Sequence, residues 1–369
     1  MPAALDAVVA GYLGVDLAPG FLSSDGAMPL GQLLRPGKLT EVGQLEISPG
    51  GLVANAGLAM GALGNRVALM GLVGTDPLGD LLLGLLQGRG VSLSLRRTGA
   101  AGTAYGIVLA PPQTDRMFLE CPGCNATFTS TDLDYETIGA SRLFHFGYPP
   151  LMAALFADGG AELEAMFSRV RGLGVATSLD MALPDPQGPA GGVNWRSLLV
   201  RVLPHVDIFA PSIEELLYML APAEWAQLTE AAGERDVVDL IPEALYSAIA
   251  DESIALGATI VFIKAGHRGG YCRTGSIAEL LATTRLSLPA ESFTNRELWL
   301  PAFPADRTRM RNACGAGDAA VAGFLTAILR GESLETAGRV AMLAGRDSLY
   351  GVDTTSGLTS WGTMMKACR

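Results

Sequence analysis

The amino-acid sequence predicts an α/β fold with a doubly wound, mostly parallel central sheet, helices on both faces and a small β-sheet lid. Short β-type runs alternate with helical stretches, which is the pattern of successive β–α–β units. Apolar residues make up 49% of the chain and charged residues 17%, so a large buried core can form. Residues 40–47 and 93–119 lack a helical pattern and are expected to be antiparallel strands of a separate small sheet over a cleft.

The expected elements follow one another from the amino terminus. Residues 7–12 form a first apolar strand. Residues 52–63 form a helix that ends at Gly64, a residue type favoured just after helices. Asp76 and Pro77 open the next helix, which extends to Leu86. Further strands are expected at 67–73, 142–146, 175–179, 206–210 and 259–264, and further helices at 152–170, 213–220, 315–329 and 334–349.

Composition and charge narrow the class of protein. One domain over residues 1–369 is expected. A formal net charge of -11 disfavours binding to nucleic acids and anionic membranes. The cysteine count of 5 fits reduced thiols, and the amino terminus lacks the basic region of a signal peptide, so a cytoplasmic location is expected. The uncharged stretch 47–65 is long enough to span a bilayer, but its proline and glycines argue against that interpretation.

A glycine loop near the carboxyl terminus is the first candidate for chemistry. The run Asn312-Ala-Cys-Gly-Ala-Gly-Asp318 leads directly into an apolar helix. Unpaired backbone N–H groups and the helix dipole at such a terminus bind phosphate, and glycines let the backbone approach it closely. Asp318 would then accept a proton from a nearby hydroxyl. On spacing alone, a helix-capping role for Asp318 is equally open.

A distant second motif favours the catalytic interpretation. The run Pro49-Gly50-Gly51-Leu-Val-Ala-Asn55 continues through Gly64 into Met70-Gly-Leu-Val-Gly74-Thr-Asp76-Pro-Leu-Gly79. With the carboxyl-terminal Gly-Ala-Gly-Asp, it resembles the ribokinase-like carbohydrate kinases, also called the phosphofructokinase-B type, over nearly the whole chain. The resemblance implies an ATP- and Mg²⁺-dependent kinase for a sugar-like hydroxyl, and it leaves open a monovalent cation and a homodimer.

The resemblance also implies roles for individual residues. Asp318 is the expected base, beside an anion hole formed by Ala313, Cys314, Gly315, Ala316 and Gly317. The expected acceptor contacts are Asp16, Gly50, Gly51, Asn55 and Asn125. The nucleotide is expected beside Lys264, Gly266, Gly269, Ala313 and Cys314, with Glu215 acting indirectly on the metal. The lid is expected from about residues 14–50 and 92–122.

The sequence departs from the family pattern at the metal-ordering positions. Asn312 and Ala313 replace the usual Asp-Thr pair, and Ser212 replaces the Asn of an Asn-x-x-Glu segment that ends at Glu215. These changes leave the base and the anion hole intact but put the metal geometry in doubt. A nucleoside kinase of the same superfamily and a weakly catalytic sugar-sensing relative remain alternatives.

Other polar residues have competing interpretations. Cys121 and Cys124 have metal-ligand spacing but no partner pair, so a turn with two thiols is favoured. Arg116 would contact an acidic acceptor or simply face solvent. His145 and Asp180 lie at strand ends, where open α/β sheets gather their ligand sites. Arg268 would reach nucleotide phosphates or face solvent.

Overall fold

The large sheet carries the helices that position the site. The computed structural model describes residues 5–21, 34–110, 117–311 and 314–368. Nine strands form one sheet in the order β13-β12-β11-β10-β9-β8-β1-β4-β5. All neighbours from β5 to β11 are parallel, and β12 and β13 add an antiparallel edge. The bounds are β1 (Ala7–Gly11), β4 (Val67–Gly74), β5 (Ser92–Thr98), β8 (Leu143–Gly147), β9 (Ala176–Asp180), β10 (Ile208–Phe209), β11 (Ile260–Lys264), β12 (Gly269–Thr274) and β13 (Glu297–Pro301).

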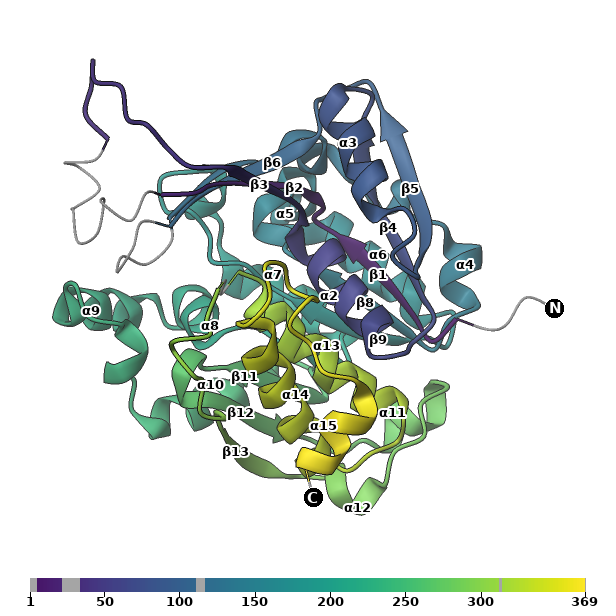
Figure 1. Ribbon diagram of the computed structural model, residues 1–369. Helices are drawn as coiled ribbons and strands as arrows, with labels where there is room; N and C mark the ends of the chain where they lie inside the picture. The colour runs from purple at the N-terminus through teal and green to yellow at the C-terminus, as the bar shows by residue number, and fades with distance from the viewer. Residues whose placement is uncertain (1–4, 22–33, 111–116, 312–313, 369) are drawn as a thin grey trace.

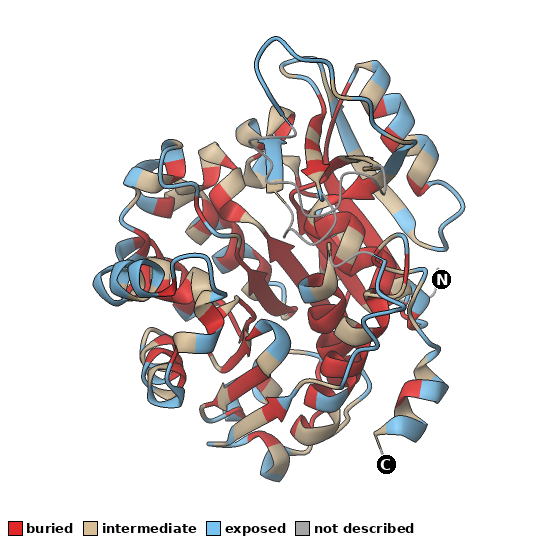
Figure 2. Cartoon of the chain, turned by 60° about the vertical axis from the view of Figure 1, so that its left-hand side comes forward, coloured by how far each residue is buried: buried red, intermediate tan, exposed pale blue. Residues whose placement is uncertain are grey.

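Helices cover both faces of this sheet (Figure 1). Alternate residues of β1 enter different apolar clusters, Val8 and Ala10 on one face and Ala7 and Val9 on the other. The strands β1, β4, β8 and β9 are buried at every position, as expected when a parallel sheet is covered on both sides. Figure 2 shows the central strands as a continuous buried layer.

Two sets of helices contribute to the two clusters. The cluster that contains Val9 includes side chains of α2 (Gly51–Ala62), α3 (Pro77–Leu86), α11 (Ala278–Thr283), α12 (Ala290–Phe293), α13 (Ala316–Leu329), α14 (Leu334–Ser348) and α15 (Trp361–Ala367). The cluster that contains Val8 includes side chains of α4 (Tyr135–Gly139), α5 (Ala153–Phe156), α6 (Ala161–Arg171), α7 (Trp195–Val202), α8 (Ile213–Leu220), α9 (Pro222–Ala232) and α10 (Glu243–Ala255). The sequence prediction of a mostly parallel α/β sheet is thus confirmed.

A second, four-stranded sheet projects from the amino-terminal half (Figure 1). Its order is β3-β2-β6-β7, with β2 (Gly14–Pro19), β3 (Leu45–Gly50), β6 (Ala104–Leu109) and β7 (Met117–Cys121). This is the predicted lid, with two corrections. β5 pairs with β4 in the large sheet, because the β4–α3–β5 crossover returns it parallel to β4. β2 also pairs in parallel with β6, since a long segment rather than a hairpin joins them.

Two stretches of the sequence differ in structure from a single continuous helix. The helix expected at 152–170 is two helices, α5 and α6, because Asp158, Gly159 and Gly160 have positive φ between them. The uncharged stretch 47–65 is the end of β3 followed by α2, which has 12 residues. Within the described ranges, no helix combines the length and apolar character needed to cross a membrane.

Candidate active site

Asp318 lies in the first turn of α13, at the edge of the sheet where the parallel strands end. Its side chain is only 3% exposed. Gly315 precedes the helix with a φ of 75°, and a Cβ atom there would lie 2.1 Å from Oγ1 of Thr354. The position therefore requires glycine on both backbone and steric grounds. No side chain caps α13, so Asp318 is not the helix cap that spacing had left open.

Two side chains from distant parts of the chain hold the Asp318 carboxylate. Asn55 of α2 donates its Nδ2–H to Oδ2 at 2.9 Å, and Tyr148 donates its hydroxyl to Oδ1 at 2.5 Å. Thr354 in turn donates to Oδ1 of Asn55 at 2.8 Å, which fixes the orientation of that amide. Burial raises the pKa of Asp318, and the hydrogen bond from Tyr148, the charge of Lys264 and the hydrogen bond from Asn55 oppose this rise.

A buried ion pair lies near Asp318. Nζ of Lys264, at the end of β11, lies 2.6 and 2.7 Å from the two carboxylate oxygens of Asp180, at the end of β9. Burial disfavours the ammonium, but the charges of Asp180 and Glu215 outweigh it and raise the pKa of Lys264. Burial raises the pKa of Asp180, and Lys264 counteracts it. We treat the pair as ionised because both oxygens contact the ammonium. A Cβ atom on Gly317 would lie 4.0 Å from Nζ of Lys264, so this charge is beside the amino terminus of α13.

Glu215 is held in a capping box at the start of α8. Ser212 donates its backbone N–H to Oε2 of Glu215 at 2.6 Å, and Glu215 donates its backbone N–H to Oγ of Ser212 at 3.3 Å. Ser212 also forms a parallel bridge with Lys264, which places the capping box next to the ion pair. Among the described residues, no group of three or more His, Cys, Asp or Glu side chains is arranged to bind a metal ion.

The lid carries a pair of acidic side chains, Asp16 and Glu120, and the charge of Asp318 acts on Asp16. Asp16 lies on β2, and a Cβ atom on Gly50 would approach its Oδ1 to 2.1 Å, so glycine is needed there. A Cβ atom on Gly106 would lie 2.7 Å from Glu120 Oε2 and 3.3 Å from Asp16 Oδ1, so both carboxylates border this one glycine. Tyr12 donates its hydroxyl to Glu120. Burial and the charges of Glu120 and Asp318 raise the pKa of Asp16 to about 7.

Comparison with known proteins identifies the family of this chain. The sequence profile described as pfkB family carbohydrate kinase matches residues 28–355. The chain belongs to the pfkB family. It is 23% identical over 285 residues to an uncharacterized sugar kinase of Archaeoglobus fulgidus, covering 77% of this chain and 91% of that protein. It is 28% identical over 175 residues to the probable fructokinase-4 of Arabidopsis thaliana, covering 47% of this chain and 52% of that protein.

Solved structures agree on the fold. An Arabidopsis thaliana ribokinase complexed with ribose and ATP superimposes with a TM-score of 0.71 at 18% identity, covering 100% of this chain and 99% of that one. A fructokinase from Xylella fastidiosa with bound ATP gives a TM-score of 0.70 at 17% identity, covering 98% and 97%. The chain is therefore a carbohydrate kinase of the ribokinase-like fold, as its sequence motifs predicted.

Three further predicted residues of the kinase have definite places. Gly51 opens α2 with a φ of 79°, and a Cβ atom there would lie 2.7 Å from the carbonyl oxygen of Tyr12, so Gly50 and Gly51 form the junction between lid and core. Asn125 is fully buried beneath the lid and donates its Nδ2–H to the carbonyl of Leu13 at 2.9 Å. Its Oδ1 has no hydrogen-bond partner among the described residues.

The turn after β11 has the expected glycines and carries Arg268. Gly266 and Gly269 have φ values of 50° and 103°. A Cβ atom on Gly269 would lie 2.0 Å from the carbonyl oxygen of Leu300, so β12 passes very close to β13. Arg268 is partly exposed and donates to the backbone carbonyls of Val238 and Ile241.

Several other sequence candidates can be placed or set aside. Asn312, Ala313 and Arg116 lie outside the described residues, and Cys314 directly precedes Gly315. Cys121 and Cys124 form no disulfide, in keeping with the predicted turn. His145 is fully buried within the sheet, with Nδ1 2.9 Å from Oγ of Ser178, and so does not line a cleft. Burial and the charge of Lys264 lower the pKa of His145 to about 3.

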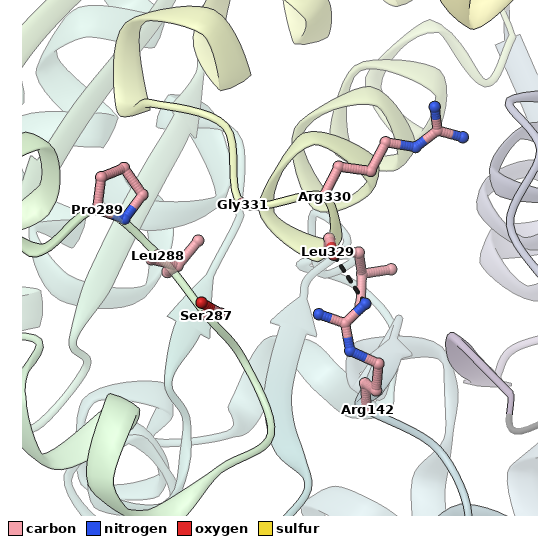
Figure 3. A pocket seen from close by; sticks show the side chains of 7 residues that line it. All are labelled: Arg142, Ser287, Leu288, Pro289, Leu329, Arg330 and Gly331. Carbon is pink, nitrogen blue, oxygen red and sulfur yellow. Dashed lines mark hydrogen bonds between the residues drawn. The ribbon is translucent and has the colours of Figure 1, made fainter.

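A hollow of about 440 Å³ lies at the opposite end of α13 (Figure 3). Arg142 lines it and donates to the carbonyl of Leu329 at 2.8 Å. Leu329 is eleven positions after Asp318 in α13, which is about 16 Å at 1.5 Å per residue. The hollow is therefore distant from the cluster of polar side chains around Asp318.

Sequence reasoning missed three polar residues of the site. Tyr148 follows β8, Glu120 lies on the lid strand β7, and Thr354 lies in the loop after α14. None belongs to the two glycine motifs, and each reaches the site only through contacts with residues more than a hundred positions away. No local pattern in the sequence marks them.

Proposed function

We propose that this kinase transfers the γ-phosphoryl group of ATP to a hydroxyl of a neutral, sugar-like acceptor, with Asp318 as the general base. The observation that carries this proposal is the Asp318 carboxylate, buried at the amino terminus of α13 and held by Asn55 and Tyr148. It lies in the first turn of a helix whose amino terminus attracts phosphate, so an acceptor hydroxyl beside it would meet both a base and an electrophile.

The chemistry is a direct, in-line transfer. Asp318 takes the proton of the acceptor hydroxyl as its oxygen bonds to the γ-phosphorus. The bond from that phosphorus to the oxygen bridging it to the β-phosphate breaks, and ADP leaves with the electron pair. The backbone N–H groups of Ala316 and Gly317, together with the ammonium of Lys264, would stabilise the negative charge on the transferring group.

The donor set near the ion pair fits a loosely held magnesium ion. Mg²⁺ keeps several of its waters and binds through few carboxylates together with substrate phosphates. Oε2 of Glu215 is engaged by the capping box, so Glu215 offers its other oxygen, directly or through water. Mg²⁺ bound with ATP would neutralise charge on the phosphates. A monovalent cation remains a prediction of the sequence resemblance.

The acidic lid pair favours a neutral acceptor over an anionic one. Burial raises the pKa of both Asp16 and Glu120, and no described lysine or arginine counteracts this rise. A sugar acid or sugar phosphate would be repelled there, whereas hydroxyl groups donate hydrogen bonds to carboxylates. This supports a neutral sugar or a nucleoside ribose.

An acceptor panel separates the proposal from its alternatives. Thermal-shift measurements with sugars, sugar acids, sugar phosphates and nucleosides, with and without a non-hydrolysable ATP analogue, would identify stabilising ligands. ADP release is then measured with each ligand that stabilises. Turnover of a neutral sugar supports the proposal, turnover of nucleosides alone supports the nucleoside kinase, and ligand binding without ADP release supports the sugar sensor.

The predicted homodimer has a specific candidate surface. The lid's edge strands β3 and β7 expose apolar side chains, with Ile47 at 41%, Phe118 at 53% and Leu119 at 56% exposure. Exposed apolar edges of this kind are commonly covered by a partner. Light scattering of the purified kinase, compared with a Phe118→Lys variant, tests whether the lid is the interface.

A further inference from the structure

Tyr148 has an unusual backbone conformation. It directly follows β8 and has φ 58° and ψ 60°. Only Asp158 and Asn295 share a positive φ among the non-glycine residues of the described chain. A bulky side chain adopts this conformation at an energetic cost, and such costs concentrate at functional sites. The conformation is held by the turn into Pro149, where Leu151 donates its N–H to the carbonyl of Tyr148 at 3.0 Å.

The strained turn directs the phenol to the proposed base. The Tyr148 hydroxyl lies 2.5 Å from Oδ1 of Asp318, a short distance for a neutral donor and typical of a charge-assisted bond. Burial and the charge of Asp318 raise the pKa of Tyr148 far above its ordinary value. The phenol therefore keeps its proton and acts as a donor.

The hydrogen bonds leave the carboxylate ready for an acceptor. An ionised carboxylate has about four lone-pair sites. Tyr148 occupies one site on Oδ1 and Asn55 occupies one on Oδ2, so each oxygen retains a site. Because the donors lie on opposite oxygens, the carboxylate cannot rotate without losing both bonds. Each bond also favours the charged form over the neutral acid.

We propose that Tyr148 is a positioning residue, whose hydroxyl fixes the carboxylate of Asp318 and keeps it ionised in a site from which water is excluded. The inference rests on the proposed function, because it takes Asp318 as the base. Asp318 is also affected by charged groups on other elements. These are Lys264 of β11, which stabilises its charge, and Asp16 of β2, Asp180 of β9 and Glu215 of α8, which are acidic neighbours of the same site.

A purely structural role for Tyr148 is the competing explanation. Its ring packs against both apolar clusters, so the ring alone would contribute to stability. Tyr148→Phe retains the ring and removes only the donor. Tyr135→Phe is the matched control. Tyr135 lies in α4, which packs against α6 and β1. This helix precedes the start of β8, whereas Tyr148 follows the end of the same strand.

The test measures the protonation of Asp318 itself. With ¹³Cγ-labelled aspartate, the Asp318 signal is identified by its absence in Asp318→Asn, and its midpoint is followed with pH. We expect Tyr148→Phe to raise the midpoint by about one to two pH units, the effect of losing one hydrogen bond to a charged group. The midpoint of the acidic limb in the pH profile of kcat should rise by the same number of pH units. Tyr135→Phe should change neither.

A second variant covers the case in which Tyr148→Phe does not fold. Replacing Tyr148 with 3,5-difluorotyrosine retains the ring and makes the phenol a stronger donor, so the midpoint should fall. An unchanged Asp318 midpoint in both variants, or a loss of kcat by the same factor at every pH, overturns the proposal. The titration needs no acceptor, so its failure is distinct from failure of the proposed function, which Asp318→Asn kinetics would reveal.

Discussion

The ammonium of Lys264 contacts both oxygens of Asp180, at 2.6 and 2.7 Å, and the two side chains are 13% and 0% exposed. They come from β11 and β9, which are separated in the sheet by β10. The pair brings a positive charge to the amino terminus of α13, where the transferring phosphate is proposed to lie. Because both groups are buried, removing either one alone is expected to lower the stability of the fold substantially.

Breaking this pair should destabilise the fold strongly. Lys264→Met leaves Asp180 buried without its partner, and a loss of about 3–5 kcal/mol in the free energy of unfolding is expected. The double variant Lys264→Met/Asp180→Leu removes both charges and should lose much less than the sum of the single variants. Urea unfolding of the four proteins measures this difference. Additive losses would show that the pair is not coupled.

Gly315 should tolerate no side chain. Gly315→Ala places a methyl group against Thr354 Oγ1 in a left-handed backbone, and a loss of about 1–3 kcal/mol in stability is expected. Gly362 in α15 is the control, because nothing lies within 4 Å of a Cβ atom built there. Gly362→Ala should be neutral or stabilise by up to about 1 kcal/mol. Equal melting temperatures for the two variants would contradict this steric account.

His145 should make the fold sensitive to mild acid. Its pKa is lowered to about 3, so between the ordinary value of 6.5 and about 3 the unfolded chain binds a proton that the folded chain does not. The free energy of unfolding should therefore decrease as the pH is lowered through this window, by about 1.4 kcal/mol per pH unit once the pH is well below 6.5. His145→Gln should lose less stability than wild type between pH 7 and pH 5, as measured by urea unfolding. Parallel pH dependences would contradict the assignment.

The acidic lid pair should set the affinity for the acceptor. Asp16→Asn and Glu120→Gln each remove a charged hydrogen-bond acceptor, so KM for the sugar should rise about 10- to 100-fold while KM for ATP stays unchanged. The control is Glu46→Gln, an exposed glutamate on lid strand β3. Since the pKa of Asp16 is about 7, wild-type KM should fall as the pH rises through 7, and Asp16→Asn should lose this dependence. Wild-type KM values in both variants would refute the role of the pair.

The sequence predicted the parts of the site that local backbone chemistry determines. Gly315 and Gly51 are needed for turns beside helix termini, and such turns have a recognisable spacing next to Asp318 and Asn55. The sequence did not predict which sheet β5 joins. A strand of the lid and an edge strand of the large sheet can have the same alternation of side chains, so the pattern in β5 does not distinguish them. The role of Tyr148 could not be predicted from the sequence, because it depends on a strained turn and on a contact with a residue 170 positions away.

The proposed mechanism depends most on Asp318 acting as the general base. Asp318→Asn retains the size of the side chain and one of its two acceptor oxygens but cannot take a proton, so kcat should fall by at least about 10²–10⁴-fold. Asp80, an exposed aspartate in the first turn of α3, is the matched control, and Asp80→Asn should keep full activity. The most direct measurement is kcat of Asp318→Asn with the identified acceptor, alongside ATP binding by calorimetry. We expect near-complete loss of turnover with ATP binding retained, and a wild-type kcat in this variant would show that Asp318 is not the base.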